Sequence, residues 1–154
     1  ERIKSEFEKE KTKLAEEKNK IVDLALEKNA VQFGQKKENL EINKEGYLKF
    51  KRYPDGSPSN ELLHVWVAEN QIYNAQKKFF SDEYPNKYLR SGGLEVHHID
   101  YDKVNNKKEN LAIISKEQHA GIPHKDIPKG DWVTGIKILN DMKIKQPHID
   151  ELKP

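Results

Sequence analysis

The chain has 154 residues, of which 35% are charged and 34% hydrophobic, with a formal net charge of +2 at pH 7 and no cysteine. This length allows one modest domain with an appendage but not two full cores. The absence of cysteine excludes disulfides and thiolate zinc fingers, so any metal must be held by histidine, carboxylate or amide groups. A charge balance this close to zero does not by itself indicate nucleic-acid binding.

No stretch approaches the roughly 20 consecutive apolar residues that a membrane-spanning helix needs. No charged start followed by an apolar core indicates a signal peptide either. We therefore expect a soluble protein that does not enter the membrane, and the absence of cysteine favours an intracellular compartment. Because the chain begins at Glu1 rather than at methionine, a missing targeting signal carries little weight.

Residues 1 to about 30 predict one long helix, since they contain no glycine or proline and are dominated by Glu, Lys, Ala and Leu. A half-apolar heptad seam runs along it, formed by Ile3, Phe7, Glu10, Leu14, Glu17, Ile21 and Leu24. The helix is a dimerising coiled coil, an arm laid along a partner, or a solvated helix supported by pairs such as Glu16 with Lys20. We expect residues 21–26 to pack against the body or a partner. The seam permits a homodimer without requiring one.

The helical pattern breaks at Gly34 and the polar segment after it, which places a boundary between about 30 and 45. We therefore expect three parts: an N-terminal helical extension at residues 1–45, a domain at 46–124 and a C-terminal helical tail at 125–154.

The domain opens with GYLKFKRYPDGSPSN, which predicts a strand entering a hairpin or loop at the Pro-Asp-Gly signal. The next segment, ELLHVWVAENQIYNAQKKFF, predicts a buried helix with Trp66 as a core anchor. His64 in this helix is more often a hydrogen-bonded structural residue than a site residue. The stretch SDEYPNKYLRSGG has the composition of a loop.

Three histidines mark the following segment. Residues 94–97 predict a short strand that leads to the adjacent pair His97 and His98, and residues 111–114 predict a second strand after a polar loop. Ser115 followed three residues later by glutamine is a capping-box signature, so a helix carrying His119 should begin there. The three histidines converge if that helix folds back over the hairpin.

The tail predicts one further helix, from about Asp131 to Met142. Asp131 can cap its start. Trp132, Ile136 and Leu139 fall on one face, which we expect to cover the domain.

The order His98, Asn110, His119, preceded by His97 and set in VHHID, ENLAII and EQH, resembles the HNH endonucleases of the ββα-metal superfamily. GYLKF followed by LLHVWVAEN is similar to the region before this motif in phage and homing-type members. The resemblance covers about residues 46–119. It implies an α+β fold with a ββα-metal core, here flanked by the long N-terminal helix and the helical tail.

The resemblance also implies a function. The protein would be a metal-dependent endonuclease that nicks or cuts DNA, expected to be double-stranded, in the cytoplasm of a bacterial or phage-infected cell. His98 would be the general base, and Asn110 would brace the loop and orient His98 by hydrogen bonding. His97 and His119 would hold one divalent ion, which could be Mg, Mn, Ni or Zn, although imidazole ligands suit zinc or nickel better than magnesium.

Seven basic residues are candidates for contacts with DNA phosphates, and they are Lys49, Lys51, Arg52, Lys103, Lys107, Lys108 and Lys116. An ordinary solvated surface explains them equally well. The alternative to a nuclease is therefore a non-catalytic nucleic-acid-binding or assembly module stabilised by metal. A structural zinc normally has four protein ligands, and this segment offers two or three.

Three features of the histidine segment bear on whether its histidines serve one site. Successive side chains of a strand face opposite ways, so irregular backbone is expected between His97 and His98 if both serve one site. Gly121 and Pro123 should stop the helix soon after His119. His124 could supplement or replace His119, although a surface histidine is the favoured interpretation.

Overall fold

The structure is a computed structural model that describes residues 2–52, 55, 57, 59, 61–76, 89–90 and 93–150. Two small antiparallel sheets and several short helices follow one long N-terminal helix. The expected α+β class is confirmed at this level. Within the described part, none of the helices combines the length and apolar character needed to cross a membrane.

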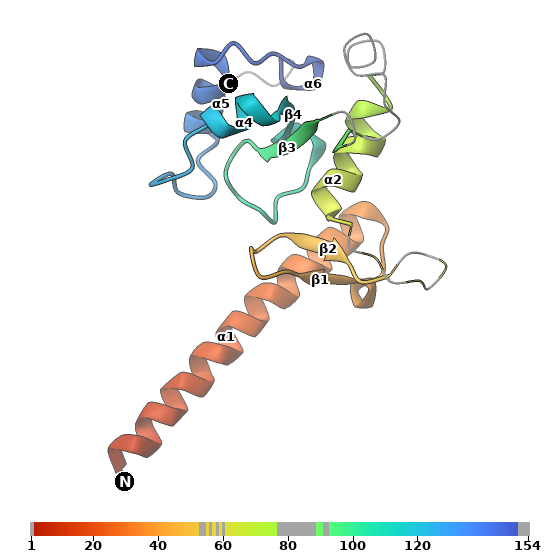
Figure 1. Cartoon of the computed structure of the whole chain (residues 1–154). Coiled ribbons are helices and arrows are strands. Elements are labelled where there is room, and N and C mark those ends of the chain that lie inside the picture. The colour runs from red at the N-terminus through yellow and green to blue at the C-terminus, as the bar shows by residue number, and fades with distance from the viewer. Residues whose placement is uncertain are drawn as a thin grey trace.

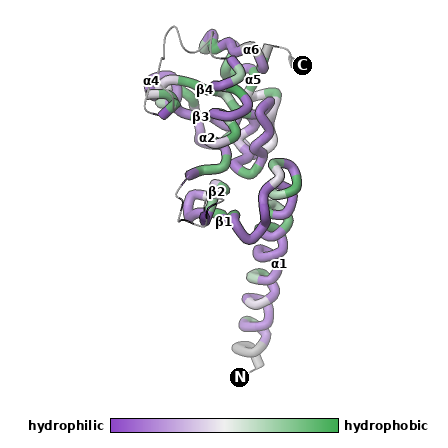
Figure 2. Tube along the Cα trace, turned by 90° about the vertical axis from the view of Figure 1, so that its right-hand side faces the viewer, coloured by the Kyte–Doolittle hydropathy of each residue, from purple (hydrophilic) through white to green (hydrophobic). Residues whose placement is uncertain are grey.

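The long helix predicted at the N-terminus is α1 (Arg2–Phe33), which projects from the rest of the protein (Figure 1) and is mostly hydrophilic (Figure 2). It ends at Gly34, whose φ of 63° lies in the left-handed region that glycine adopts without steric cost. Ile21 and Leu24 are 64% and 65% exposed. The first side chain packed into the hydrophobic core is Leu26, so the core covers only the end of the predicted segment, and packing of its earlier residues against a partner stays a prediction.

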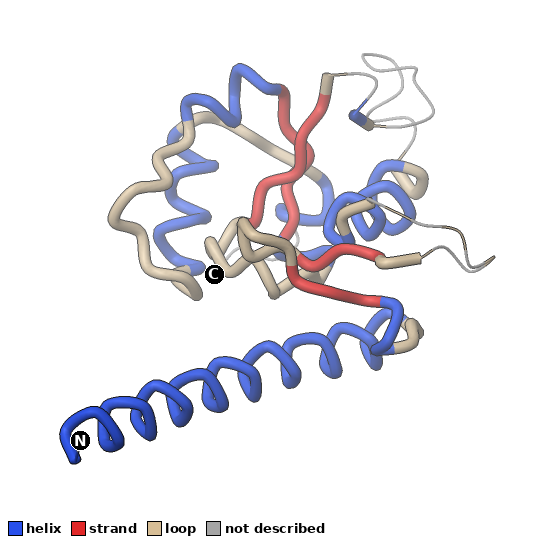
Figure 3. The backbone as a smooth tube through the Cα atoms, turned by 60° about the horizontal axis from the view of Figure 1, so that its bottom comes forward, coloured by secondary structure: helices blue, strands red, loops and turns tan. Residues whose placement is uncertain are grey.

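A first hairpin lies beside the C-terminal end of α1 (Figure 3). The 3-10 helix η1 (Lys37–Asn39) leads into β1 (Leu40–Ile42), which pairs antiparallel with β2 (Leu48–Phe50). The strand predicted in GYLKF is present, but its partner precedes it, and the expected Pro-Asp-Gly turn lies partly outside the described residues. Because β1 lies before residue 46, the pairing crosses the predicted domain boundary.

The buried helix predicted after this hairpin is formed by α2 (Leu63–Val67) and the π-helical η2 (Ala68–Tyr73), which continue one another. Four of the five α2 residues are buried. Trp66 is partly buried and packs edge-on against Phe50, with 5.6 Å between ring centroids. The loop predicted at residues 81–93 lies largely outside the described part of the chain.

The second hairpin, β3 (Leu94–His98) and β4 (Leu111–Ser115), is antiparallel and agrees with the two predicted strands. Helix α4 (Lys116–Gly121) follows β4 directly. Its start is the predicted capping box, in which Ser115 and Gln118 form both reciprocal hydrogen bonds. The helix is six residues long, so the expected early stop is confirmed.

This second hairpin is buried on both faces. Leu111 and Ile113 pack into a core shared with α1, β2 and α2. Ala112 and Ile114, which alternate with them, pack into a second core shared with α5 (Trp132–Asp141). A strand covered on both sides reads as a continuous apolar run, which explains the sequence LAII.

Helix α5 is the predicted tail helix. The side chain of Asp131 accepts a hydrogen bond from the backbone N–H of Thr134 at 3.1 Å and caps its start. A Cβ at Gly135 would lie 1.8 Å from the carbonyl oxygen of Ile99, so only glycine allows this close approach. The predicted core-facing residues are confirmed, and they are Trp132, Ile136 and Leu139.

The outer edge of β4 is closed by the tail. The backbone N–H of Ile113 donates to Oε1 of the buried Gln146 at 3.0 Å, and Nε2 of the same side chain donates to the carbonyl of Ile113. In α6 (Pro147–Asp150), Nε2 of His148 lies 2.6 Å from the carbonyl oxygen of Leu111. These side chains satisfy backbone groups that an edge strand would otherwise leave unpaired.

Candidate metal centre

The two adjacent histidines lie on opposite faces of β3. Pairing with β4 continues in register through the end of the strand, with His97 opposite Ala112 and His98 opposite Leu111. The expectation of irregular backbone between the histidines is therefore wrong. Alternation places His98 on the face of Val96, toward α1 and α2, and His97 on the opposite face, toward α4.

Three imidazoles from three segments gather on the α4 side. His97 comes from β3, His119 from α4, and His124 from the turn that follows, and each offers a ring nitrogen within 4.8 Å of the others. Tyr101 supports the turn because its hydroxyl donates to the carbonyl of Pro123 at 2.6 Å. His124 is exposed, as the favoured interpretation held, and it also lies in this cluster, where it can supplement His119.

The chemistry of this cluster fits a metal ion. Nε2 of His97 is buried and has no hydrogen-bond partner among the described residues, a costly state for a polar atom unless a further group binds it. Burial, followed by the nearby His119 and His124, lowers the pKa of His97 to about 3. Its ring is therefore neutral near pH 7, as a metal ligand must be.

A carboxylate orients the second imidazole. Nδ1 of His119 lies 3.0 Å from Oε2 of Glu95. Since a carboxylate only accepts, Nδ1 carries a proton, which in the neutral ring leaves the lone pair on Nε2, the arrangement common among metal-binding histidines. The three histidines can therefore bind one ion, and their donor set leaves the identity of that ion open.

His98 occupies a different environment, between β3 and α2. Its Nε2 lies 2.8 Å from Oδ1 of the buried Asn106. The ring of His64 is 4.7 Å away, centroid to centroid, and that of Tyr47 is 5.8 Å away. Burial lowers the pKa of His98, and the hydrogen bond with Asn106 opposes this shift. The expectation that Asn110 holds His98 is wrong, because Asn106 makes that contact.

Asn110 instead braces the loop between the strands, as the other part of the prediction held. It ends the 3-10 helix η4 (Lys108–Asn110). Its Oδ1 accepts from the backbone N–H of Asp100 at 2.9 Å, and its Nδ2 donates to Oδ1 of Asp100 at 2.7 Å and to the carbonyl of Asn105 at 2.8 Å. The loop that leaves β3 is thereby tied to the start of β4.

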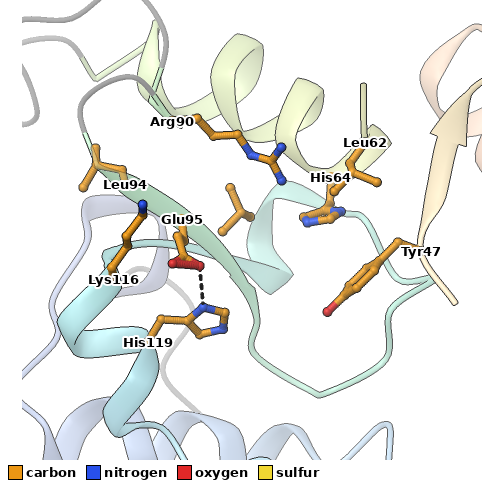
Figure 4. Close-up of a pocket in the computed structure, with 9 residues that line it drawn as sticks. Tyr47, Leu62, His64, Arg90, Leu94, Glu95, Lys116 and His119 are labelled. Carbon is orange, nitrogen blue, oxygen red and sulfur yellow. Dashed lines mark hydrogen bonds and ion pairs between the residues drawn. The ribbon is translucent and has the colours of Figure 1, made fainter. Parts of the chain in front are cut away.

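Two cavities open beside the histidines. A small one of about 40 Å³ is lined by the whole triad and by His98, together with Tyr47, Val96, Tyr101 and Lys103. A larger one of about 420 Å³, drawn in Figure 4, lies beyond His119 and is lined by His64, Arg90, Lys116 and Glu95 among others. The triad and His98 thus reach a common cavity although they lie on opposite faces of β3.

The predicted basic residues are not gathered at one place. Lys103 lines the small cavity, where its Nζ lies 4.8 Å from the ring centroid of Tyr47, and Lys116 lines the large one. Lys49 forms an ion pair with Glu41 at 3.1 Å. The other four are exposed and line neither cavity, and they are Lys51, Arg52, Lys107 and Lys108.

Four residues that line the large cavity or hold His98 were not predicted from the sequence as site residues. They are His64, Arg90, Glu95 and Asn106. Only period-two alternation could have indicated Glu95, because it shares a strand face with His97. His64 reaches the site from an earlier helix, whereas Arg90 and Asn106 come from the segments just before and after β3, where no periodic spacing indicates which side chain faces the site.

No protein-family model, curated protein or solved structure matches this chain. The assignment of a function therefore depends on the site itself.

We predict that His124→Ala weakens zinc binding by about tenfold or more, because it removes one of three imidazole donors. Isothermal titration of the purified metal-free protein with zinc measures the effect. Lys125→Ala is the matched control, since it changes the neighbouring exposed residue. Wild-type affinity in His124→Ala would restrict the ligand set to His97 and His119.

We predict that acid destabilises the metal-free protein from about pH 6.5 downward. Burial and the neighbouring His98 lower the pKa of His64 to about 2, whereas unfolded histidine titrates near 6.5. The unfolded state therefore binds more protons below pH 6.5, which costs about 1.4 kcal/mol per pH unit for this group, while above pH 6.5 the contribution is fully present.

Urea unfolding at a series of pH values measures this slope. His64→Phe keeps a ring beside Tyr47 and His98 but cannot bind a proton, so its unfolding free energy should fall less steeply with acid. Equal slopes in the two proteins would show that His64 is not held neutral by the fold.

Proposed function

We propose that this protein is a metal-dependent HNH endonuclease that hydrolyses DNA phosphodiester bonds, with β3, β4 and α4 as its ββα-metal core. The observation that carries the proposal is the shared cavity, since the metal-competent triad and His98 both line it. Phosphodiester hydrolysis needs a base for the attacking water and a cation at the same phosphate. A separate metal site and a separate buried histidine would not meet that requirement.

The side chains would divide the chemistry as follows. His97, His119 and His124 would hold the ion, which when bound would neutralise charge on the phosphate and assist the leaving oxygen. His98, kept neutral by burial, would take the proton of the attacking water. Three protein ligands leave room for water and phosphate at the ion, as a catalytic site requires.

The cationic residues of the large cavity support the proposal of a polyanionic substrate. Arg90 and Lys116 line it from opposite sides of β3, as Figure 4 shows, and His119 connects it to the triad. Glu95 is the acidic residue in its lining, and its carboxylate is engaged by His119. A phosphate of DNA next to the scissile bond would therefore meet two cations here.

A non-catalytic module with a structural metal is the second candidate, favoured by the buried and unpartnered Nε2 of His97, which would need an ion for stability alone. Chelation separates the two. A structural site unfolds when the metal is removed, whereas the proposed site loses activity and keeps its helical circular dichroism.

We predict that the metal-free protein leaves plasmid DNA intact. At least one of the ions Mg, Mn, Ni and Zn, when added, should allow the protein to nick or linearise the plasmid. His98→Ala should lower the cleavage rate by about 100-fold or more, the contribution expected of a general base. Glu117→Ala, at an exposed position of α4, should cleave like the wild type.

Circular dichroism and zinc affinity of His98→Ala should match those of the wild type, because His98 lies outside the triad. Undiminished cleavage by a folded His98→Ala would contradict its role as the base. Absence of cleavage with every metal would favour the binding module.

A further inference from the structure

A chain of buried side-chain amides connects the N-terminal helix to His98. Nδ2 of Asn29 in α1 donates to the carbonyl oxygens of Ala25 at 2.8 Å and Val104 at 3.1 Å. Nδ2 of Asn106 donates to Oδ1 of Asn29 at 3.0 Å, and Oδ1 of Asn106 lies 2.8 Å from Nε2 of His98. Asn29 and Asn106 are only 2% and 1% exposed.

The hydrogen bonds of Asn29 determine which atom donates and which accepts in each of the bonds between Asn29 and His98. Backbone carbonyls only accept, so the group of Asn29 that faces Ala25 and Val104 must be its NH₂. Its Oδ1 then faces Asn106 and requires a donor there, which turns Oδ1 of Asn106 toward the imidazole. Since that oxygen also only accepts, Nε2 of His98 must carry the proton.

The consequence for His98 is a defined tautomer. With the proton on Nε2, a neutral ring keeps its lone pair on Nδ1. No hydrogen bond to Nδ1 of His98 is found within the described residues. Nδ1 is therefore the nitrogen that can accept a proton from water in the adjoining cavity.

We propose that Asn29 and Asn106 are positioning residues for His98, which hold its ring and its Nε2–H tautomer so that Nδ1 serves as the base. The catalytic part of this inference rests on the proposed nuclease function, whereas the tautomer itself does not. The long helix is then part of the active-site support, because two carbonyls that hold Asn29 belong to α1 and to the loop after β3.

The test uses two variants at the central link. Asn106→Leu keeps the approximate shape and removes both hydrogen bonds, whereas Asn106→Asp keeps an acceptor for His98. Nitrogen-15 NMR of the metal-free full chain should find a proton on Nε2 of His98 that exchanges slowly with water in the wild type and in Asn106→Asp. Asn106→Leu should lose this protection.

Cleavage kinetics supply the second readout. In Asn106→Leu, kcat should fall by about tenfold or more while KM and zinc affinity remain within threefold, and Asn106→Asp should retain most of the wild-type kcat. A proton on Nδ1 in the wild type, or full activity in a folded Asn106→Leu, would overturn the proposal. If the wild type cleaves no DNA, the NMR result still decides the tautomer of His98. Failure of the positioning role of Asn29 and Asn106 can therefore be distinguished from failure of the nuclease assignment.

A second, independent feature is the seam on the free part of α1. Its apolar members are each more than 60% exposed and recur at the two core positions of one heptad, and they are Phe7, Leu14, Ile21, Leu24 and Val31. The body packs against the other side of the helix, at Leu26, Asn29, Ala30 and Phe33. The seam is thus open from Phe7 to Val31, more than three heptads.

The charged residues of this seam favour an antiparallel pair of helices over a parallel pair. In a parallel pair of identical helices, Glu10, Glu17 and Lys28 would each face their own copy, which places three like-charge pairs at the interface. In an antiparallel pair with Phe7 opposite Val31, Leu14 meets Leu24 and Glu10 meets Lys28.

We infer that a second copy of this chain packs antiparallel along the seam. Antiparallel pairing matches apolar residues with apolar residues, and it places each Glu10 carboxylate beside the Lys28 ammonium of the other copy. Glu17 then lies opposite Ile21, where its flexible stem can keep the carboxylate in water. This inference does not depend on the nuclease function.

Charge reversal tests both the partner and the direction. In sedimentation equilibrium of the full chain, Glu10→Lys and Lys28→Glu should each weaken self-association by about tenfold or more, and the double variant should return to within threefold of the wild type. Glu8→Lys, on the outer face, is the control and should change little. A monomeric wild type at all accessible concentrations, or a double variant no stronger than the single ones, would overturn the inference.

Discussion

The unbroken pairing of β3 with β4 is the constraint on which the site depends. Because the register continues through His98, the two adjacent histidines are sent to opposite faces of the strand. One then meets the histidines of α4 and the following turn, and the other meets the amides and rings beneath α1 and α2. A bulge at this point would have placed both in one environment and removed the difference between the candidate ligand and the proposed base.

This separation suits the proposed function, because a metal ligand and a general base need different surroundings. A ligand needs neighbours that can share an ion, and His97 has two imidazoles beside its buried nitrogen. A base needs a defined tautomer, a neutral resting state and an open lone pair. His98 meets these needs through burial and through Asn106. β3 ends directly after His98, so the strand does not continue as a barrier between its two faces. Both histidines therefore line the small cavity.

The polar side chains of the loop that leaves β3 lie between the two cores, where they are paired with one another and with the backbone. Asp100, Asn105 and Asn110 bond one another and the local backbone, so the loop leaving β3 keeps a fixed course between two apolar layers. An unpaired polar group there would cost more than the hydrogen bond contributes. The same rule applies at Asn29, where α1 enters the body, and it ties the long helix to the position of the catalytic candidate.

The sequence by itself determined the elements whose signals are local. The long helix, the strands around His97 and in LAII, the capping box at Ser115 and the cap at Asp131 follow from composition, periodicity and short spacing, and they are present. It also indicated His97 and His119 as members of one metal cluster.

Only the tertiary structure decided which distant residues complete that cluster and its surroundings. His124 turns back because Tyr101 holds its segment, His64 arrives on a helix from before the motif, and Asn29 arrives on α1. Asn106 rather than Asn110 holds His98 because the loop course, not its spacing, sets which amide faces the ring. Such contacts join residues through packing and burial, and neither leaves a periodic signal along the chain.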